Sequence, residues 1–247
     1  MSAARMFNSF QTKAGSNLDL SRSQAPPQAV TKPLSALQRL CSAEGRWRRA
    51  LAFMEREPSV YRRRAIKALG LASADHVLDI GCGAGRSLAE IAAEAPDGCV
   101  FGADSSDLLA QMALRRNRHL VEAHRADVVV ASAASLPFED GAFDKALCLD
   151  AIYFWNDLSQ AFGEIARVMK RGGRMALIFR TSSETPLRAF PAEVCCFLAQ
   201  ADVIAPLEAS GFAVETRDEL PCMRTASPVL LVATKTARRA RIRPHTK

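Results

Sequence analysis

The chain has 247 residues, of which 49% are hydrophobic and 24% charged, and it carries a formal net charge of +7. This length suits one α/β domain with a large core plus tails, and no apolar run approaches the roughly 20 residues of a membrane span. Residues 235–247 hold six Lys or Arg and no acid, so the rest of the chain is nearly neutral. We therefore expect no membrane span and no specific nucleic-acid partner.

The chain begins with residues 1–33, which are rich in Ser, Ala, Gln and Pro and are predicted to form a disordered tail. Their basic excess leaves an organellar transit peptide open as an alternative. Residues 34–72 repeat apolar side chains near helical spacing, which predicts an N-terminal helical cap. Residues 73–235 should form the main domain, and 236–247 a disordered basic tail.

From residue 76 onward, apolar strand patterns alternate with helical ones. Strands are predicted at 76–80, 99–103, 127–131, 145–149, 174–179, 211–220 and 228–235, and helices at 86–95, 106–124, 157–169 and 191–210. Gly172 and Gly173 should end the third of these helices. The alternation predicts an α/β fold, a doubly wound, mostly parallel sheet with helices on both faces. Ligands of such sheets bind beyond the carboxyl ends of the strands.

The stretch VLDIGCGAGRS, residues 77–87, places Gly81, Gly83 and Gly85 within five positions after the first strand. Glycines so closely spaced indicate that another group presses against the main chain. A P-loop would need a Lys-Ser or Lys-Thr pair, and a dinucleotide fingerprint needs Gly or Ala where Arg86 stands. Nicotinamide oxidoreduction is therefore a weaker alternative, and an adenosine ligand without a pyrophosphate is favoured.

Asp104 ends the second strand, in FGADSS. An acid at this spacing after a glycine loop meets a ribose diol in nucleotide-binding βαβ units. The alternative is that Asp104 only caps the following helix.

Together with SAASLPFEDGAFDKALCLDAIYFWND and EIARVMKRGGRMAL, these motifs resemble the class I S-adenosylmethionine-dependent methyltransferases, in particular the small-molecule branch called methyltransferase type 11, over about residues 45–235. The resemblance implies a Rossmann-like, seven-stranded sheet with a final antiparallel strand, and S-adenosyl-L-methionine as the cofactor. It implies these cofactor-binding residues: Asp79, Gly81, Cys82, Gly83, Asp104, Ser105, Ser132, Ala133 and Leu149. Many relatives carry an acid where Ser132 stands, so recognition of the adenine edge would rest here on a hydroxyl and backbone groups.

The segment LDAIYFWND, after the fourth strand, holds the catalytic candidates Asp150 and Tyr153. Asp150 is either a general base or a partner of the methionine ammonium. Tyr153 and Trp155 are candidate walls of an acceptor pocket, and Arg180 and Arg188 are candidate partners of an acidic acceptor.

The four histidines all fall away from the carboxyl ends of the strands, which disfavours a histidine base. The seven cysteines form no C-x-x-C pair, so we expect no metal site. Reduced thiols of this kind suit a cytoplasmic protein.

These motifs predict methyl transfer from S-adenosylmethionine to a small organic acceptor by in-line displacement, for which alignment is the main requirement. A methyltransferase-like binding or assembly protein without turnover is the alternative. Nucleic-acid methylation is disfavoured because LDAIYF stands where an Asn/Asp-Pro-Pro-aromatic signature would be needed. The acceptor and the oligomeric state stay open.

Overall fold

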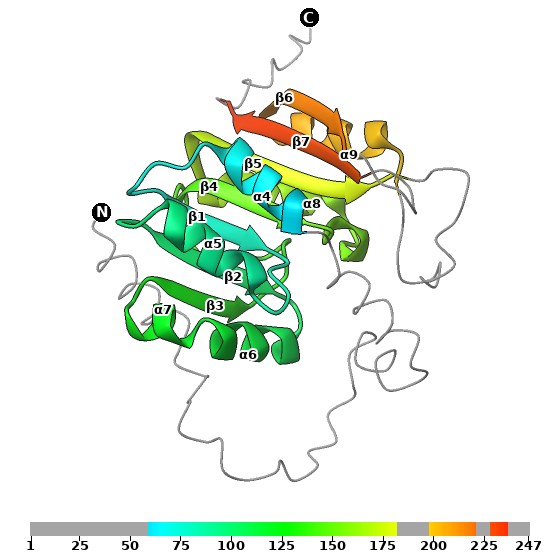
Figure 1. Ribbon diagram of the computed structural model, residues 1–247. Coiled ribbons are helices and arrows are strands. Elements are labelled where there is room, and N and C mark those ends of the chain that lie inside the picture. The colour runs from blue at the N-terminus through cyan, green and yellow to red at the C-terminus, as the bar shows by residue number, and fades with distance from the viewer. Residues whose placement is uncertain (1–58, 182–197, 221–227, 237–247) are drawn as a thin grey trace, which may run out of the picture.

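The computed structural model describes residues 59–181, 198–220 and 228–236 (Figure 1). They form one seven-stranded sheet in the order β3-β2-β1-β4-β5-β7-β6. The strands are β1 (His76–Ile80), β2 (Cys99–Asp104), β3 (Ala126–Val130), β4 (Phe143–Leu149), β5 (Met169–Arg180), β6 (Phe212–Glu219) and β7 (Pro228–Lys235). Neighbouring strands among β3, β2, β1, β4 and β5 pair in parallel, whereas β7 is antiparallel to both β5 and β6. The predicted Rossmann-like sheet with a final antiparallel strand is confirmed.

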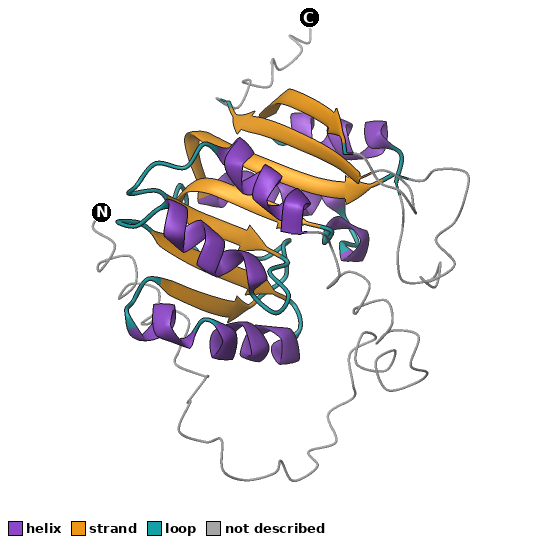
Figure 2. Ribbon diagram, viewed as in Figure 1, coloured by secondary structure: helices purple, strands orange, loops and turns teal. Residues whose placement is uncertain are grey.

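Helices cover both faces of the sheet (Figure 2). They are α4 (Ser59–Leu69), α5 (Arg86–Glu94), α6 (Asp107–Arg116), α7 (Arg118–Glu122), α8 (Leu158–Val168) and α9 (Gln200–Ala209). Apolar side chains of α4, α5 and α6 form one buried cluster with the sheet, and those of α8 and α9 belong to the cluster on the other face. This two-sided cover explains why every residue of β1 is buried.

Side chains of β1 alternate between the two clusters, as the pleat of a strand requires. Val77 packs into the cluster with α4 and α5, whereas Leu78 and Ile80 pack into the cluster with α8. Asp79 is an acid within this buried strand. Its position near the carboxyl end directs attention to that edge of the sheet.

The long helix predicted over 106–124 is interrupted in the structure. Helix α6 ends at Arg116, and α7 begins at Arg118, on the other side of Asn117. The Asn117 side-chain amide is buried and donates to the carbonyl oxygens of Gly85 at 2.8 Å and Ala113 at 2.9 Å. The break therefore ties the end of α6 to the glycine loop.

The paired glycines do not end the helix before β5, as the sequence had suggested. Helix α8 ends at Val168, and β5 begins at the next residue. The pairing of β4 with β5 jumps from Met169 to Arg174, so residues 170–173 form a bulge in which Gly172 has a φ of 76°. Glycine is needed here for the positive φ of a bulge inside the strand.

The predicted tails, 1–33 and 236–247, lie outside the described residues except for Thr236. Of the predicted cap, 34–72, only residues from Ser59 onward are described, and these include α4. The helix predicted over 191–210 is described from Gln200 to Ala209. Within the described ranges, no helix has the length and apolar character needed to cross a membrane.

Candidate functional site

A cavity of about 460 Å³ lies at the carboxyl ends of β1, β2, β3 and β4. This is the edge at which a doubly wound sheet is expected to bind ligands. All nine residues predicted to bind the cofactor line it: Asp79, Gly81, Cys82, Gly83, Asp104, Ser105, Ser132, Ala133 and Leu149. The structure thus brings together residues that span 71 positions of the sequence because each lies at, next to or just after the carboxyl end of a neighbouring strand.

The glycine loop passes close to the loop after β4. Gly81 has a φ of 71°, and a Cβ on this residue would lie 2.3 Å from the Cβ of Ala151. Its amide and that of Cys82 both donate to the Ala103 carbonyl oxygen, at 2.7 and 3.2 Å. A Cβ at Gly83, in contrast, would meet no atom within 4 Å. The loop is therefore packed tightly at Gly81 and is open at Gly83.

Asp79 places a buried carboxyl group at the floor of the cavity. Its side chain is 1% exposed and accepts a hydrogen bond from the Ser87 hydroxyl at the start of α5. Burial, with a smaller contribution from the neighbouring Asp104, raises the pKa of Asp79 to about 7, although the hydrogen bond from Ser87 and the charge of Arg62 act in the opposite direction. A buried acid of this kind is stabilised by a cationic partner.

Asp104 places a second carboxyl group beside the glycine loop. One oxygen accepts from the Gly83 amide and the other from the Ser106 amide, both at 2.9 Å. Burial raises the pKa of this group above its usual value. The cap of α6 is Ser106, whose hydroxyl accepts from the Leu109 amide at 3.4 Å. The alternative in which Asp104 itself caps the helix is therefore wrong.

Arg62 and Ser87 line the same cavity, and neither was predicted from the sequence. Arg62 comes from α4 and donates to Glu90 Oε1 through Nε at 3.0 Å and Nη2 at 2.6 Å. Nothing in the run YRRR distinguishes Arg62 from its neighbours before α4 is packed on α5. The signal for Ser87 was its place in the first turn of the helix that follows the glycine loop.

Asp150 lines the cavity where β4 ends, with a left-handed φ of 51°. The Tyr153 hydroxyl donates to its Oδ1 at 2.7 Å and accepts a hydrogen bond from the backbone amide of Arg180. The Arg180 Nε lies 4.0 Å from Asp150 Oδ2. Such a φ is uncommon for a residue other than glycine, and these contacts hold it in place.

Tyr153 and Arg180 are buried and are not among the described residues that line the cavity. The structure places both behind Asp150, as its partners. The sequence had suggested that both contact the acceptor and that Tyr153 also acts in catalysis. Arg188 lies outside the described residues. Trp155 does line the cavity, and its ring packs against Phe162 with centroids 5.6 Å apart.

The far end of the cavity lies between the segment after β3 and the first turn of α8. Ser132, Ala133 and Ala134 come from the segment, and Gln160 and Ala161 from the helix. Ala133 is buried, whereas Ser132 is exposed. A flat apolar group with a polar edge fits such walls.

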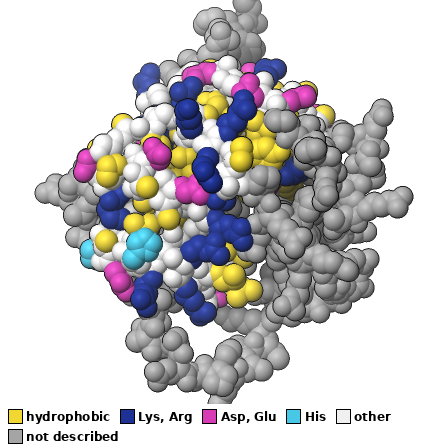
Figure 3. All heavy atoms as spheres, in the orientation of Figure 1, with side chains coloured by type: hydrophobic (Ala, Val, Ile, Leu, Met, Phe, Trp, Pro, Cys, Tyr) yellow, Lys and Arg dark blue, Asp and Glu magenta, His cyan; other side chains and the backbone are white. Residues whose placement is uncertain are grey.

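Neither a histidine base nor a metal site finds support among the described residues. None of their histidines lines the cavity, and none of their His, Cys, Asp and Glu side chains group as metal ligands would. On the outer surface, Figure 3 shows Lys and Arg side chains interspersed with acidic and apolar ones over the face that carries α4 and α5.

Known methyltransferases are similar in sequence to part of this chain. Residues 78–177 match the family described as a methyltransferase domain. An O-methyltransferase of Pyrenophora dematioidea is 33% identical over 102 residues, which are 41% of this chain and 38% of the relative. The chain spans between a third and a half of the length of the first curated relatives it matches.

Solved structures share the fold at low sequence identity. Geranyl diphosphate C-methyltransferase from Streptomyces coelicolor A3(2) is 19% identical, with a TM-score of 0.64 over 72% of this chain and 77% of that one. The [4+2]-cyclase SpnF is 18% identical, with a TM-score of 0.62 over 71% of this chain and 80% of that one. The family match covers 100 of the 247 residues and, together with the sheet order and the glycine loop, identifies residues 78–177 as a class I S-adenosylmethionine-dependent methyltransferase domain.

Proposed function

We propose that the chain binds S-adenosylmethionine in the cavity and transfers its methyl group to a small organic acceptor. The observation that carries this proposal is the pair of buried carboxyl groups, Asp79 and Asp104, on either side of a bare glycine loop. Burying two acids in one cavity is costly unless a positive ligand or hydrogen-bond donors offset the cost. S-adenosylmethionine offers an ammonium group, a sulfonium and two ribose hydroxyls.

The residues present fit this cofactor part by part. Asp79 would take the ammonium group, and the Arg62 guanidinium, which lines the same end of the cavity, would take the carboxylate. Asp104 would accept from the ribose hydroxyls. The open space over Gly83 leaves room for a ligand against the main chain, and Ser132 with Ala133 would flank the adenine.

The bound cofactor supplies an activated methyl group, so the chain need only align the acceptor and exclude water. Asp150 lies beside the glycine loop and is the residue that we propose to face the reacting groups. Tyr153 is buried and holds the Asp150 carboxylate through one hydrogen bond, so we assign it a positioning role. Trp155 lines the cavity near Asp150 and would form part of the acceptor wall.

Two roles for Asp150 follow from this position, and one variant separates them. If Asp150 is the general base, the Asp150→Asn variant should bind the cofactor as the native chain does and fail to transfer the methyl group. If Asp150 instead takes the cofactor ammonium, the same variant should bind weakly.

A second candidate is a protein that keeps the cavity and carries out no methyl transfer. It is favoured by the likeness to SpnF, a [4+2]-cyclase with the same fold. The two candidates differ in methyl transfer and share ligand binding.

The deciding experiment uses the full chain. Equilibrium dialysis with S-adenosylmethionine tests binding, and incubation with methyl-labelled donor and a metabolite extract tests transfer. The proposal predicts saturable binding and a labelled small product, with both reduced in the Asp104→Ala variant. Binding without any labelled product would favour the second candidate, and absence of binding would refute both.

We further infer a cytoplasmic location. Among the described residues, Cys82, Cys99 and Cys148 are free thiols buried in the core, as suits a reducing compartment. Fractionation of the source cells with an antibody against the chain would test this, and recovery from an oxidising compartment would contradict it.

A further inference from the structure

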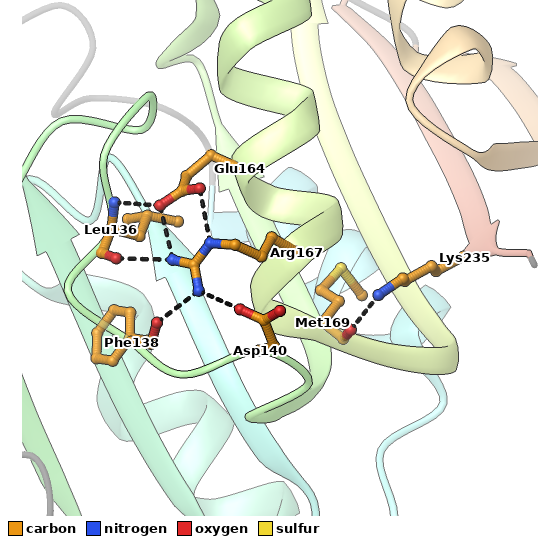
Figure 4. A network of polar contacts seen from close by, with 7 residues as sticks. All are labelled: Leu136, Phe138, Asp140, Glu164, Arg167, Met169 and Lys235. Atoms are coloured by element: carbon orange, nitrogen blue, oxygen red, sulfur yellow. Dashed lines mark hydrogen bonds and ion pairs between the residues drawn. The ribbon is translucent and has the colours of Figure 1, made fainter. Parts of the chain in front are cut away.

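Arg167, on α8, donates all five of its guanidinium hydrogens to neighbouring groups (Figure 4). Nε and Nη2 bind the two oxygens of Glu164, one turn earlier on the helix, at 2.8 and 2.7 Å. Nη1 binds the Phe138 carbonyl at 2.8 Å and Asp140 Oδ1 at 2.7 Å, and Nη2 also binds the Leu136 carbonyl at 3.0 Å. A guanidinium offers five donors in one plane, so this one is saturated.

Residues 136–141, which include three of these acceptors, also donate hydrogen bonds to α8. Glu164 Oε1 accepts from the Leu136 amide at 2.8 Å, and the Arg167 carbonyl oxygen accepts from the Gly141 amide at 2.9 Å. The hydrogen bond from Arg167 lowers the pKa of Glu164, so the pair is charged at neutral pH. The side chains of Glu164 and Arg167 therefore hold residues 136–140 against the helix, and the Arg167 backbone holds Gly141.

This segment continues the wall of the cavity. Residues 132–135 form a tight turn, in which the Ser135 amide donates to the Ser132 carbonyl at 3.0 Å and the Ala134 amide to Ser132 Oγ at 3.2 Å. The opposite wall is the first turn of α8, which includes Gln160. The first wall continues into residues 136–141, and the second wall belongs to α8. The Glu164–Arg167 pair joins these two elements, so it fixes the position of one wall relative to the other.

A second arginine in the chain shows what a purely structural role looks like. Arg125 donates to the carbonyl oxygens of Gly98 at 2.8 Å, Ala92 at 3.0 Å and Ala95 at 2.7 Å. Like Arg167 it is partly buried, but neither it nor any of these three partners lines the cavity. Arg125 is therefore a matched control for the loss of an arginine that binds backbone carbonyls.

We propose that Arg167, acting with Glu164, is a positioning residue that holds the wall formed by Ser132 to Ala134 at the correct distance from α8 for the purine base of the ligand. The inference rests on the proposed function, because it assigns the base to this end of the cavity. Arg167 itself would touch neither the base nor the reacting atoms.

The test measures the affinity of the full chain for S-adenosylhomocysteine and for S-inosylhomocysteine, which carries an oxygen in place of the 6-amino group. The ratio of the two affinities is informative because a loss of folded protein lowers both equally. The Arg167→Met variant should bind S-adenosylhomocysteine about tenfold more weakly, with a ratio closer to one, because charged hydrogen bonds that order the wall are lost. The Arg125→Met variant should keep the native ratio.

Should the Arg167→Met variant fail to fold, Arg167→Lys keeps the charge and should lower the ratio in the same direction. A native ratio in the Arg167 variants, an equal fall in the Arg125→Met variant, or a native chain that does not discriminate between the two ligands would each overturn the inference. If the native chain binds neither ligand, the proposed function fails first, so the two failures are distinguishable.

Discussion

Replacing Asp79 with asparagine should stabilise the ligand-free protein at pH 8 while weakening its binding of the cofactor. The carboxyl group is fully buried in β1, and the Asp79→Asn variant would keep both its shape and an oxygen to accept from Ser87. What it removes is the negative charge. In the ligand-free cavity that charge is a cost, and in the proposed complex it would be the partner of the ligand ammonium.

The magnitude follows from the pKa, which rises from an ordinary 3.8 to about 7. Because the folded protein holds this proton more tightly than the unfolded chain, the contribution to stability is largest below about pH 4 and is lost as the pH rises through about 7. For the Asp79→Asn variant, this difference in pKa corresponds to a gain of about 4 kcal/mol in the free energy of unfolding at pH 8. At pH 4 it should shrink below about 1 kcal/mol, because the carboxyl group is then protonated in the folded protein and only about half ionised in the unfolded chain.

Urea unfolding followed by circular dichroism at pH 4 and pH 8 measures both values. The control is Asp107→Asn, which changes an exposed acid in the first turn of α6 and should alter the free energy of unfolding by less than about 1 kcal/mol. An Asp79→Asn variant that is no more stable than the native chain at pH 8 would refute the reasoning. So would a gain of equal size at both pH values.

Other variants test other parts of the site. Gly81→Ala should cost at least about 2 kcal/mol of stability and Gly83→Ala about 1 kcal/mol in urea unfolding, because both have positive φ and only a Cβ at residue 81 would meet another side chain. Equal losses would contradict the close approach of the two loops. Asp104→Ala should remove charge-assisted hydrogen bonds worth about 1.5 to 3 kcal/mol, so calorimetry should show about ten- to a hundredfold weaker binding of S-adenosylhomocysteine. Unchanged affinity would exclude Asp104 from the ribose site. Tyr153→Phe should leave cofactor affinity near the native value, slow methyl transfer and cost about 1 to 3 kcal/mol of stability, because a buried amide loses its acceptor. A native transfer rate would remove Tyr153 from the positioning of Asp150.

The part of the site that the sequence could predict is the part set by strand order. Asp79 and Asp104 each lie at or next to the end of a predicted strand, and parallel strands bring their carboxyl ends to one edge. Gly81 follows the first strand directly, where a helix must start after a sharp turn. These positions depend on local pattern and on a regular topology, so periodicity and spacing were enough to place them at this edge, whereas the expected role of Asp79 came from the family resemblance.

The remaining features depend on contacts between distant segments. Arg62 reaches the cavity only because α4 packs beside α5, and Arg180 turns toward Asp150 only because β5 lies next to β4. The break at Asn117 arises from its bond to Gly85, far away in sequence. The bulge at Gly172 follows from the register of β4 against β5. Helical or turn propensity within a short window carries no information about such partners.

The central claim is that the ionised form of Asp79 binds the cation of the ligand. Calorimetric titration of the full chain with S-adenosylhomocysteine between pH 5.5 and pH 8 tests it most directly. With a ligand-free pKa of about 7 for Asp79, the affinity should rise about thirtyfold over this range, with proton release on binding at pH 6 that the Asp79→Asn variant lacks. An affinity that does not change with pH, or proton release that persists in the variant, would contradict the claim.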